Sequence, residues 1–246
     1  MDDTASTMTV SAETLRQAVK LISTITDEAI VRPSEDGWHM VSISQDHVAL
    51  MDISIQSKDI DGFDPTQPPF GVKVEDLIRA MKAKGDKVTL SVEDSMLCIT
   101  VGRTVQRLPL LVTLTDPPKV PQMSLDTQAM FPSGEVASLL DVCPPKATEI
   151  IFSVSQDEVE LGVADQLNVG GTTLTIPKES CVWIDTSSAD AVASRYPMEH
   201  VSSLFKSLPR DTPVTVALDK DYPMTVTGSV PGSSFRWMVA PRVVSE

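Results

Sequence analysis

The sequence predicts an α+β protein built from two similar domains, each with antiparallel sheets and two helices. Four landmarks recur in the same order in both halves of the 246 residues, at an offset of about 122 to 126 residues. Each half contains two stretches with the periodicity of an amphipathic helix, and alternating apolar and polar runs follow them. A mixed order of strands and helices of this kind is typical of α+β proteins with mainly antiparallel sheets.

The first helix of each half begins at a serine that is followed by an acidic residue. Ser11 precedes an apolar stripe of Leu15, Val19 and Ile22, and Ser133 holds the same place in the second half. Serine is a preferred N-cap residue, and an acidic side chain in the first turn favours the positive end of the helix dipole. We expect the four helices within residues 12–25, 73–84, 133–147 and 198–210.

Alternating runs that match between the halves predict the strands. The matching runs are 37–55 with 157–176, and 87–94 with 213–220. The run at 37–55 and the run at 157–176 should each form a pair of strands. Each half then closes with one more strand, which begins at Met96 or at Met224. Chance recurrence of common patterns is the weaker explanation, because four landmarks share nearly one offset.

A proline-rich segment separates the halves. Its prolines lack the amide hydrogen that strand pairing requires, so residues 111–126 should form an extended surface connector. The predicted domains are residues 1–113 and 127–246, joined by a connector over 114–126.

The charges of the chain are unevenly placed. The 34 acidic and 20 basic residues give a formal charge of −14, which by itself argues against nucleic-acid binding. The four predicted helices nevertheless hold nine of the basic residues against six acidic ones. For any single helix this is most often an ordinary solvated face. Together, basic helices on an acidic protein would repel DNA generally and admit it at one place. The nine are Arg16, Lys20, Lys73, Arg79, Lys82, Lys84, Lys146, Lys206 and Arg210.

No residue pattern of a known catalytic or metal site is present. The sequence lacks phosphate-binding glycine loops and nucleophile or zinc-protease motifs, and the three histidines have no spacing suited to a metal. We expect a protein that is not an enzyme, with no cofactor and no metal. Three cysteines without CxxC spacing indicate buried thiols in a reducing compartment. Without a signal-peptide pattern or an apolar run near ~20 residues, we expect an intracellular protein with no membrane segment.

Five short motifs carry a family resemblance. They are Phe131 to Glu135, Phe70-Gly71-Val72 followed by Leu77, Arg79 and Lys82, Ser44 to Leu50, Val120-Pro121, and Ala240-Pro241-Arg242. Each motif is modest alone, and together they are specific. The motifs are spread from residue 44 to residue 242, and through them nearly the whole chain resembles the family of proliferating cell nuclear antigen (PCNA), the archaeal and eukaryotic sliding clamp.

The resemblance implies the DNA clamp fold, with sheets outside and helices inside, assembled as a homotrimeric ring of six similar domains. It implies a DNA polymerase processivity factor that encircles double-stranded DNA without reading its sequence. The implied partners are DNA polymerase, flap endonuclease, DNA ligase and the clamp loader, which bind through short hydrophobic peptides. We expect an archaeal protein of this kind in the cytoplasm or nucleoid, and a eukaryotic one in the nucleus.

Two sets of site residues follow. The DNA-facing residues are Arg16, Lys20, Arg79, Lys82, Lys84, Lys146, Lys206 and Arg210. The partner-peptide pocket is implied by the resemblance, and its apolar side chains and prolines suit a rigid site that loses little entropy on docking. Its residues are Ile43, His47, Leu50, Val120, Pro121, Pro223, Met238, Ala240 and Pro241, with Tyr222 at the rim.

The chain departs from the family pattern at two places. Asp141 and Glu199 lie on helices where the family usually has basic residues, so we expect a less positive channel. Pro118 replaces an apolar connector residue, so a different partner preference is expected. The alternatives are a damage-checkpoint or heterotrimeric clamp subunit and, from another class, an acidic β-rich interaction protein that does not bind DNA. The retained pocket and Ala-Pro ending favour the replicative clamp.

Overall fold

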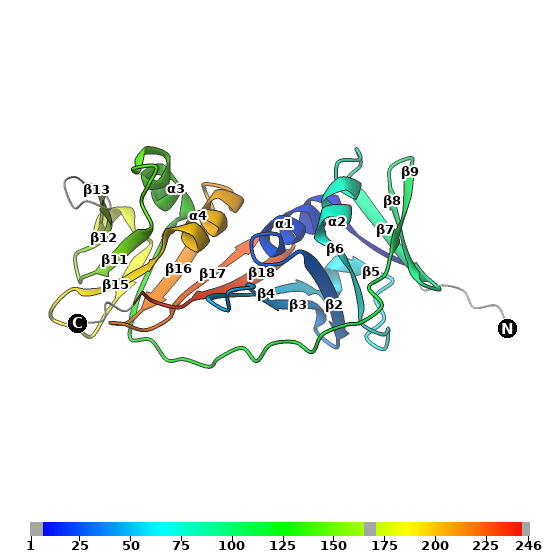
Figure 1. Cartoon of the computed structure of the whole chain (residues 1–246), viewed down its shortest axis with the longest axis horizontal. Coiled ribbons are helices and arrows are strands. Elements are labelled where there is room, and N and C mark those ends of the chain that lie inside the picture. The colour runs from blue at the N-terminus through cyan, green and yellow to red at the C-terminus, as the bar shows by residue number, and fades with distance from the viewer. Residues whose placement is uncertain (1–6, 165–170, 243–246) are drawn as a thin grey trace. The chain divides into compact units, whose positions relative to one another are not determined.

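A computed structural model describes residues 7–164 and 171–242, and these divide into two compact units (Figure 1). The first unit comprises Met1–Val120 with Val230–Phe235, and the second comprises Pro121–Ser229 with Arg236–Glu246. Each unit contains two helices and antiparallel strand pairs, as the sequence predicts, and the described strands form three sheets of five, nine and four strands. Residues 165–170, within the predicted strand pair at 157–176, lie outside the described part of the chain.

The chain repeats one motif four times: a strand, a helix and three further strands. The first unit contains β1 (Thr7–Ser11), α1 (Ala12–Ile22), β2 (Glu28–Ser34), β3 (Gly37–Ile43), β4 (Ala49–Gln56), β5 (Ile60–Asp61), β6 (Phe70–Lys73), α2 (Val74–Ala80), β7 (Lys87–Glu93), β8 (Met96–Val101) and β9 (Thr104–Pro109). The second contains β10 (Thr127–Pro132), α3 (Ser133–Val142), β11 (Glu149–Val154), β12 (Glu158–Ala164), β13 (Gly171–Pro177), β14 (Trp183–Asp185), β15 (Val192–Pro197), α4 (Met198–Ser207), β16 (Pro213–Leu218), β17 (Met224–Val230) and the end of β18 (Ser233–Val239). Short 3₁₀ turns cover Ser57–Asp59 and Lys178–Ser180.

The two motifs of each unit exchange their first strands. In the first unit β1 pairs with β7 of the second motif, while β6 pairs with β2 of the first. In the second unit β10 pairs with β16, and β15 pairs with β11, in the same manner. Every one of these pairings is antiparallel, so neither motif can complete its sheets without the other. Each unit is therefore expected to fold as one cooperative body.

One hydrogen bond recurs at the start of all four helices. The first helical N–H donates to the carbonyl of the residue just before the exchanged partner strand, at 2.8 to 2.9 Å. These bonds satisfy an amide that has no partner within the helix. The four bonds join Ala12 to Asp86, Val74 to Asp27, Ser133 to Thr212, and Met198 to Thr148.

The predicted N-cap position is confirmed for Ser11 and is wrong for Ser133. Ser11 holds the N-cap position of α1, but its side chain makes no capping hydrogen bond. Ser133 is already the first residue of α3, and its hydroxyl donates to the carbonyl of Pro209 at 2.6 Å. Because backbone carbonyls of neighbouring strands already accept from the first amides, a serine cap is not needed.

The helices lie within the predicted ranges and are shorter. Helices α3 and α4 end in the same way: the last helical residue is followed by one extended residue and then by a proline. Cys143 has ψ 153° before Pro144, and Leu208 has ψ 146° before Pro209. Proline disfavours the helical conformation of the residue before it, which explains both ends.

The strands include two that the sequence reading missed. The prediction that β8 and β17 close the two halves is wrong, because β9 follows β8 and β18 follows β17. Both missed strands alternate apolar and polar residues weakly: Thr104–Pro109 has a single buried residue, and Arg236 interrupts the apolar end of β18. Cys98 is buried as predicted, but Cys143 and Cys181 are only half-buried, so the prediction of three buried thiols is wrong for two of them.

Each unit has its own apolar core beneath its helices. Edge-to-face aromatic pairs occupy both cores, Trp38 with Phe70 at 6.4 Å and Phe152 with Tyr196 at 6.0 Å between ring centroids. Among the helices of the described ranges, none is long and apolar enough to span a membrane. Nor do residues 7–164 and 171–242 contain a cluster of three or more His, Cys, Asp or Glu side chains that could hold a metal ion.

Candidate functional site

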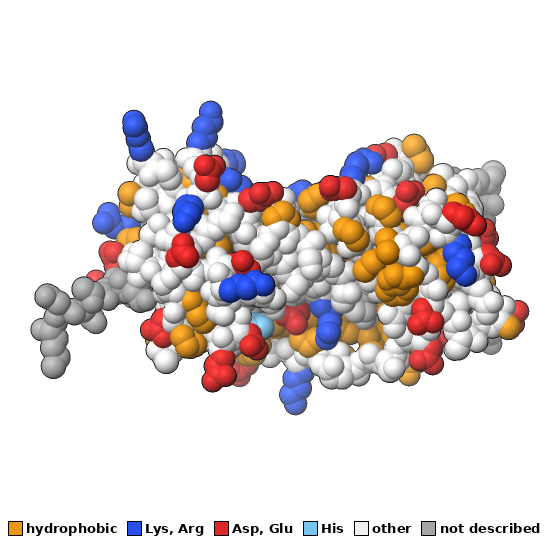
Figure 2. Space-filling view, turned by 180° about the vertical axis from the view of Figure 1, so that it is seen from behind, with side chains coloured by type: hydrophobic (Ala, Val, Ile, Leu, Met, Phe, Trp, Pro, Cys, Tyr) orange, Lys and Arg blue, Asp and Glu red, His pale blue; other side chains and the backbone are white. Residues whose placement is uncertain are grey.

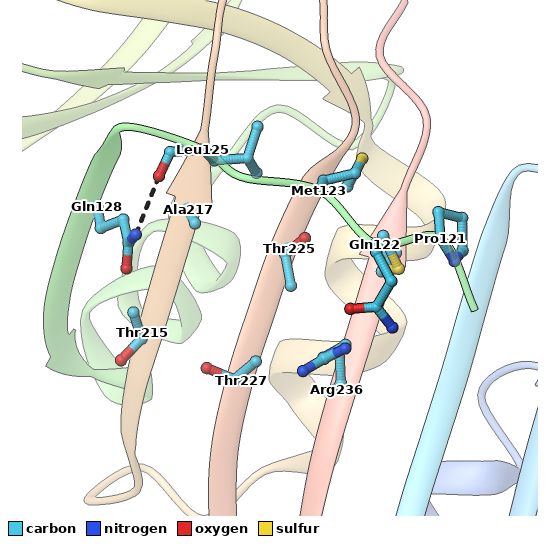
Figure 3. A pocket seen from close by; sticks show the side chains of 11 residues that line it. Pro121, Gln122, Met123, Leu125, Gln128, Thr215, Ala217, Thr225, Thr227 and Arg236 are labelled. Atoms are coloured by element: carbon cyan, nitrogen blue, oxygen red, sulfur yellow. Dashed lines mark hydrogen bonds between the residues drawn. The ribbon is translucent and has the colours of Figure 1, made fainter.

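A groove in the second unit runs between the connector and the outer face of a sheet (Figure 3). Its cavity measures about 230 Å³. The connector supplies one wall, and strands β10, β16, β17 and β18 supply the floor. The lining residues are Pro121, Gln122, Met123, Leu125, Gln128, Thr215, Ala217, Thr225, Thr227, Arg236 and Met238.

Strand alternation decides which side chains reach the groove. Thr215 and Ala217 line it, whereas Val214 and Val216 between and beside them are fully buried on the other face of β16. Neighbouring residues of a strand point to opposite faces of its sheet, which produces this division. The connector is held over the floor by Gln128, whose side-chain amide donates to the carbonyl of Leu125 at 2.9 Å. The groove therefore combines an apolar wall with a polar floor.

Six of the ten predicted pocket residues belong to the second unit. Pro121 and Met238 line the groove, although Met238 is only 5% exposed. Tyr222, 55% exposed, and Pro223 lie in the turn between β16 and β17, and Ala240 and Pro241 directly follow β18. The last two are half-buried and the segment is fixed by the amide of Arg242, which donates to the carbonyl of Arg195 at 2.8 Å.

A buried tyrosine supports the turn that carries Tyr222. The hydroxyl of Tyr196 donates to the carbonyl of Tyr222 at 3.1 Å. Burial, together with the negative charges of Asp219 and Asp221, raises the pKa of Tyr196 to about 12. The neutral hydroxyl is thus retained as a donor up to strongly alkaline pH.

The remaining four predicted pocket residues belong to the first unit. Ile43 ends β3 and is 36% exposed, Leu50 pairs with it on β4 and is buried, and Val120 lies in the connector. His47 is exposed in the β3–β4 turn with a φ of 59°, a conformation uncommon outside glycine. The Ser44 hydroxyl stabilises this turn by accepting from the amide of Ala49 at 2.9 Å. Because the ten residues are divided between two units, the complete pocket stays a prediction.

The start of the connector is anchored on the first unit. The amide of Leu111 donates to the carbonyl of Gly71 at 2.8 Å, and the Arg32 guanidinium donates to the carbonyl of Thr115. Leu111 and Leu114 pack where a Gly71 side chain would lie, 2.9 Å from the position of its missing Cβ. Glycine at position 71 thus allows the connector to lie close to strand β6.

Sequence reasoning missed most of the groove floor. Thr215, Thr225 and Thr227 alternate with apolar residues, and such threonines are usual on any solvated strand face. Arg236 was missed for the same reason. A proline-rich connector that crosses the sheet is the signal that could have identified this face as a groove.

The helices of the first unit present free lysines and engaged arginines. Arg16 is half-buried and donates to the backbone carbonyls of Met81 at 3.0 Å, Ala83 at 2.9 Å and Gly85 at 3.3 Å, just beyond α2. Arg79 forms an ion pair with Asp76. Both arginines therefore have structural partners within their own unit.

The lysines of the predicted DNA-facing set are exposed in both units. Among residues 7–164 and 171–242, no ion pair involves any of these lysines. In the first unit, on the left of Figure 2, several Lys and Arg side chains project at the upper edge, where Figure 1 draws α1, α2 and the ends of β8 and β9. The exposed lysines are Lys20, Lys82, Lys84, Lys146 and Lys206.

The one arginine of the predicted DNA-facing set that lies in the second unit, Arg210, is paired with a carboxylate. Arg210 forms an ion pair with Asp141 of α3 at 2.5 Å and donates to the Ser138 hydroxyl at 3.3 Å. Asp141 is one of the two acidic residues, with Glu199, at which we expected a less positive channel. Its effect in the structure is to cancel a charge of the predicted DNA-facing set.

Comparison with known proteins was made by sequence and by structure. No family model matches the chain. The chain is 26% identical over 255 residues to the DNA polymerase sliding clamp of Methanocella arvoryzae, covering 96% of this chain and 98% of that protein. It is 22% identical over 248 residues to the DNA polymerase sliding clamp of Natronomonas pharaonis, with the same coverage.

Solved structures with the same fold include two archaeal PCNAs. PCNA of Thermococcus kodakaraensis superposes with a TM-score of 0.87 at 16% identity, over 96% of this chain and 99% of that chain. The A. fulgidus PCNA bound to the C-terminal region of FEN-1 superposes with a TM-score of 0.85 at 17% identity, over 98% and 99%. Both comparisons therefore extend over both units.

Proposed function

We propose the following function from the premise that the chain belongs to the PCNA family of DNA polymerase sliding clamps. It is a processivity factor that closes as a ring around duplex DNA and tethers replication and repair proteins. The observation that carries this proposal is the end-to-end match with sliding clamps, which extends over 96% of the chain and both repeated units.

The role requires no catalysis by the chain itself. A closed ring retains DNA by topology, so weak and sequence-independent contacts with phosphates suffice and permit sliding. We propose that these contacts come from the basic helix residues named above, with the lysines as the free charges. Opening the ring requires energy from a separate clamp loader, since the sequence contains no ATP-binding loop.

We propose that partner peptides bind in the predicted pocket and extend into the groove beneath the connector. The C-terminal region of FEN-1 is the segment bound to the A. fulgidus PCNA. A corresponding segment of a polymerase, flap endonuclease or ligase would place its apolar plug beside His47 and Met238. We also retain the division into domains 1–113 and 127–246 with a connector over 114–126 as a proposal.

Ring formation is tested by measuring mass in solution. Light scattering should give three times the 26.6 kDa of one chain. After treatment with a clamp loader and ATP, the protein should stay on closed circular DNA and leave it once the DNA is linearised. A monomer over a wide range of concentration and salt would contradict the homotrimer, and loss from circular DNA would contradict topological retention.

A heterotrimeric subunit is the second candidate. One chain of the PCNA2–PCNA3 complex from Sulfolobus tokodaii superposes on this chain with a TM-score of 0.83 at 18% identity. This likeness is the reason to consider a heterotrimer. The heterotrimer would be supported if the purified chain formed no trimer alone but completed one when a second clamp chain from the same cell was added.

The partner pocket is tested by replacing His47 and Met238 with alanine. We expect polymerase stimulation to fall at least about tenfold while the trimer persists, because central residues that a docked peptide covers each contribute about 1 to 2 kcal/mol or more to binding. Retained stimulation would contradict the assignment. Replacing the exposed Val105 with alanine, outside the proposed pocket, is the matched control.

A further inference from the structure

The floor of the groove contains a single charged side chain. Of the eleven residues that line the groove, Arg236 is the one residue of a charged type, and none is acidic. Arg236 is half-buried on β18. Within the part of the chain that the structure describes, its side chain takes part in no hydrogen bond and no ion pair. It is a positive charge without a counter-ion inside a groove of a protein with net charge −14.

The other arginines near the second unit's surface are used differently. Arg210 is paired with Asp141, and Arg195 and Arg242 both lie 3.8 Å from the carboxylate of Glu149. These three charges are therefore compensated within the chain. Arg236 differs because the chain supplies it with no partner.

The surroundings of Arg236 suit a carboxylate. In Figure 3 the Arg236 side chain lies between those of Thr227 and Gln122, and Thr225 lies on the same strand face as Thr227. A guanidinium can donate two parallel hydrogen bonds to a carboxylate, and hydroxyl and amide groups can donate further bonds to the same oxygens. A lysine would offer only a point charge, so the arginine fork adds directional selection.

The size and wall of the groove limit what can enter. A cavity of about 230 Å³ is smaller than a typical drug-sized pocket, so it accommodates one or two side chains and not a folded domain. Pro121, Met123 and Leu125 form an apolar wall along the connector. The occupant that matches both surfaces is an extended peptide with an apolar side next to one acidic residue.

We infer that Arg236 is the anchor of an anion subsite that selects partner peptides carrying an aspartate or glutamate next to their hydrophobic plug. The inference rests on the proposed function, since it refines which peptides the clamp accepts. In the free protein the subsite is open to water. When a partner docks, its carboxylate supplies the missing counter-charge, and the apolar connector wall reduces the screening of that pair.

The test uses a labelled peptide of the FEN-1 C-terminal region and the full-length clamp. In a series of peptide variants, each residue next to the plug is replaced in turn by glutamate or by glutamine. Fluorescence anisotropy then gives the Kd for wild-type clamp, for Arg236→Gln, and for the control Arg103→Gln, an exposed arginine of the first unit outside the groove. Mass measurement of each variant verifies that the assembly is intact.

At one position we expect glutamate to bind wild-type clamp about tenfold more tightly than glutamine, the gain typical of a charge-assisted hydrogen bond. Arg236→Gln should remove this preference, and Arg103→Gln should retain it. The preference should also decrease as salt is raised. The inference is overturned if no position shows a glutamate preference that depends on Arg236 while the parent peptide still binds.

Two further outcomes separate the alternatives. If phosphoserine at the same position gains affinity through Arg236 and glutamate does not, the subsite takes a phosphate and the carboxylate inference is overturned. If the parent peptide fails to bind wild-type clamp at all, the partner-tethering function itself fails, and the inference fails with it.

Discussion

The helix pair of the first unit is tied together by Arg16, whereas the pair of the second unit is tied together by Arg210. Arg16 lies on the first helix of its unit and donates to backbone carbonyls beyond the second helix. Arg210 follows the second helix of its unit and bonds to Ser138 and Asp141 on the first. The acceptors in the first unit are uncharged, while those in the second include a carboxylate.

The helix surfaces of the two units also differ in net charge. Residues 12–25 and 73–84 of the first unit contain six basic and three acidic residues, whereas 133–147 and 198–210 of the second contain three of each. The repeated architecture is thus held together by two different arginine ties, and of these two ties only that of Arg210 pairs its positive charge with a carboxylate. We infer that the first unit provides most of the attraction for DNA.

The largest difference that we predict between the units appears at high pH. Tyr196 precedes the N-cap of α4, and the corresponding residue before the N-cap of α2 is Val72, which cannot ionise. The pKa of Tyr196 is about 12 when folded, against about 10 for an unfolded chain. A raised pKa contributes stability that is complete below about pH 10 and is lost as the pH rises through about 12, by about 2 to 3 kcal/mol.

Urea unfolding across this pH range measures the effect. The free energy of unfolding of the wild type should fall by this amount between about pH 10 and pH 12, and that of Tyr196→Phe should not show this fall. Below about pH 10 the variant should be about 1 kcal/mol less stable than the wild type, because it lacks the hydrogen bond to Tyr222. In a Tyr222→Phe background Tyr196 is the only tyrosine left, so its ionisation can be followed by ultraviolet absorbance. Equal pH dependence in wild type and Tyr196→Phe would contradict the prediction.

The second prediction compares the two arginine ties. Arg16→Met should lower the free energy of unfolding by about 2 kcal/mol, because it leaves three carbonyls near the end of α2 without a donor in a half-buried place. Arg210→Met should cost about 0.5 kcal/mol or less, since its ion pair with Asp141 is exposed to solvent. Equal losses, measured by urea unfolding at one fixed protein concentration, would show that the ties are equivalent.

The arginine ties also show how far sequence could go. The four helices and their repeated order follow from periodicity, which is local and strong in this chain. The exchange of strands β1 and β6 between motifs does not, because alternation fixes which face a residue occupies and leaves its pairing partner open. The acceptors of Arg16 are backbone carbonyls 65 to 69 residues away, and backbone groups have no signature in sequence.

The candidate site was predictable to a similar extent. The family resemblance identified Pro121 and Met238, which line the groove, and the charge pattern identified the exposed lysines. Arg236 could not be distinguished from any other arginine on an outer strand. Only the structure shows that its neighbours leave it uncompensated within a groove.

The third prediction has the smallest effect and tests the charge comparison directly. Replacing Lys20, Lys82 and Lys84 by glutamine should weaken binding of a short DNA duplex about tenfold at ~0.1 M salt. It should also make the dependence of affinity on salt less steep, because a clamp with fewer phosphate contacts releases fewer counter-ions from the DNA. Replacing Lys146 and Lys206 in the same way should weaken binding less than about threefold. The two variants replace three and two exposed lysines that lie on the helices or shortly after them, so fold and assembly should be unaffected in both. If the second-unit variant lost as much affinity as the first-unit variant, the neutralising effect of Asp141 on Arg210 would have no consequence for DNA, and the two helix surfaces would have to be treated as one.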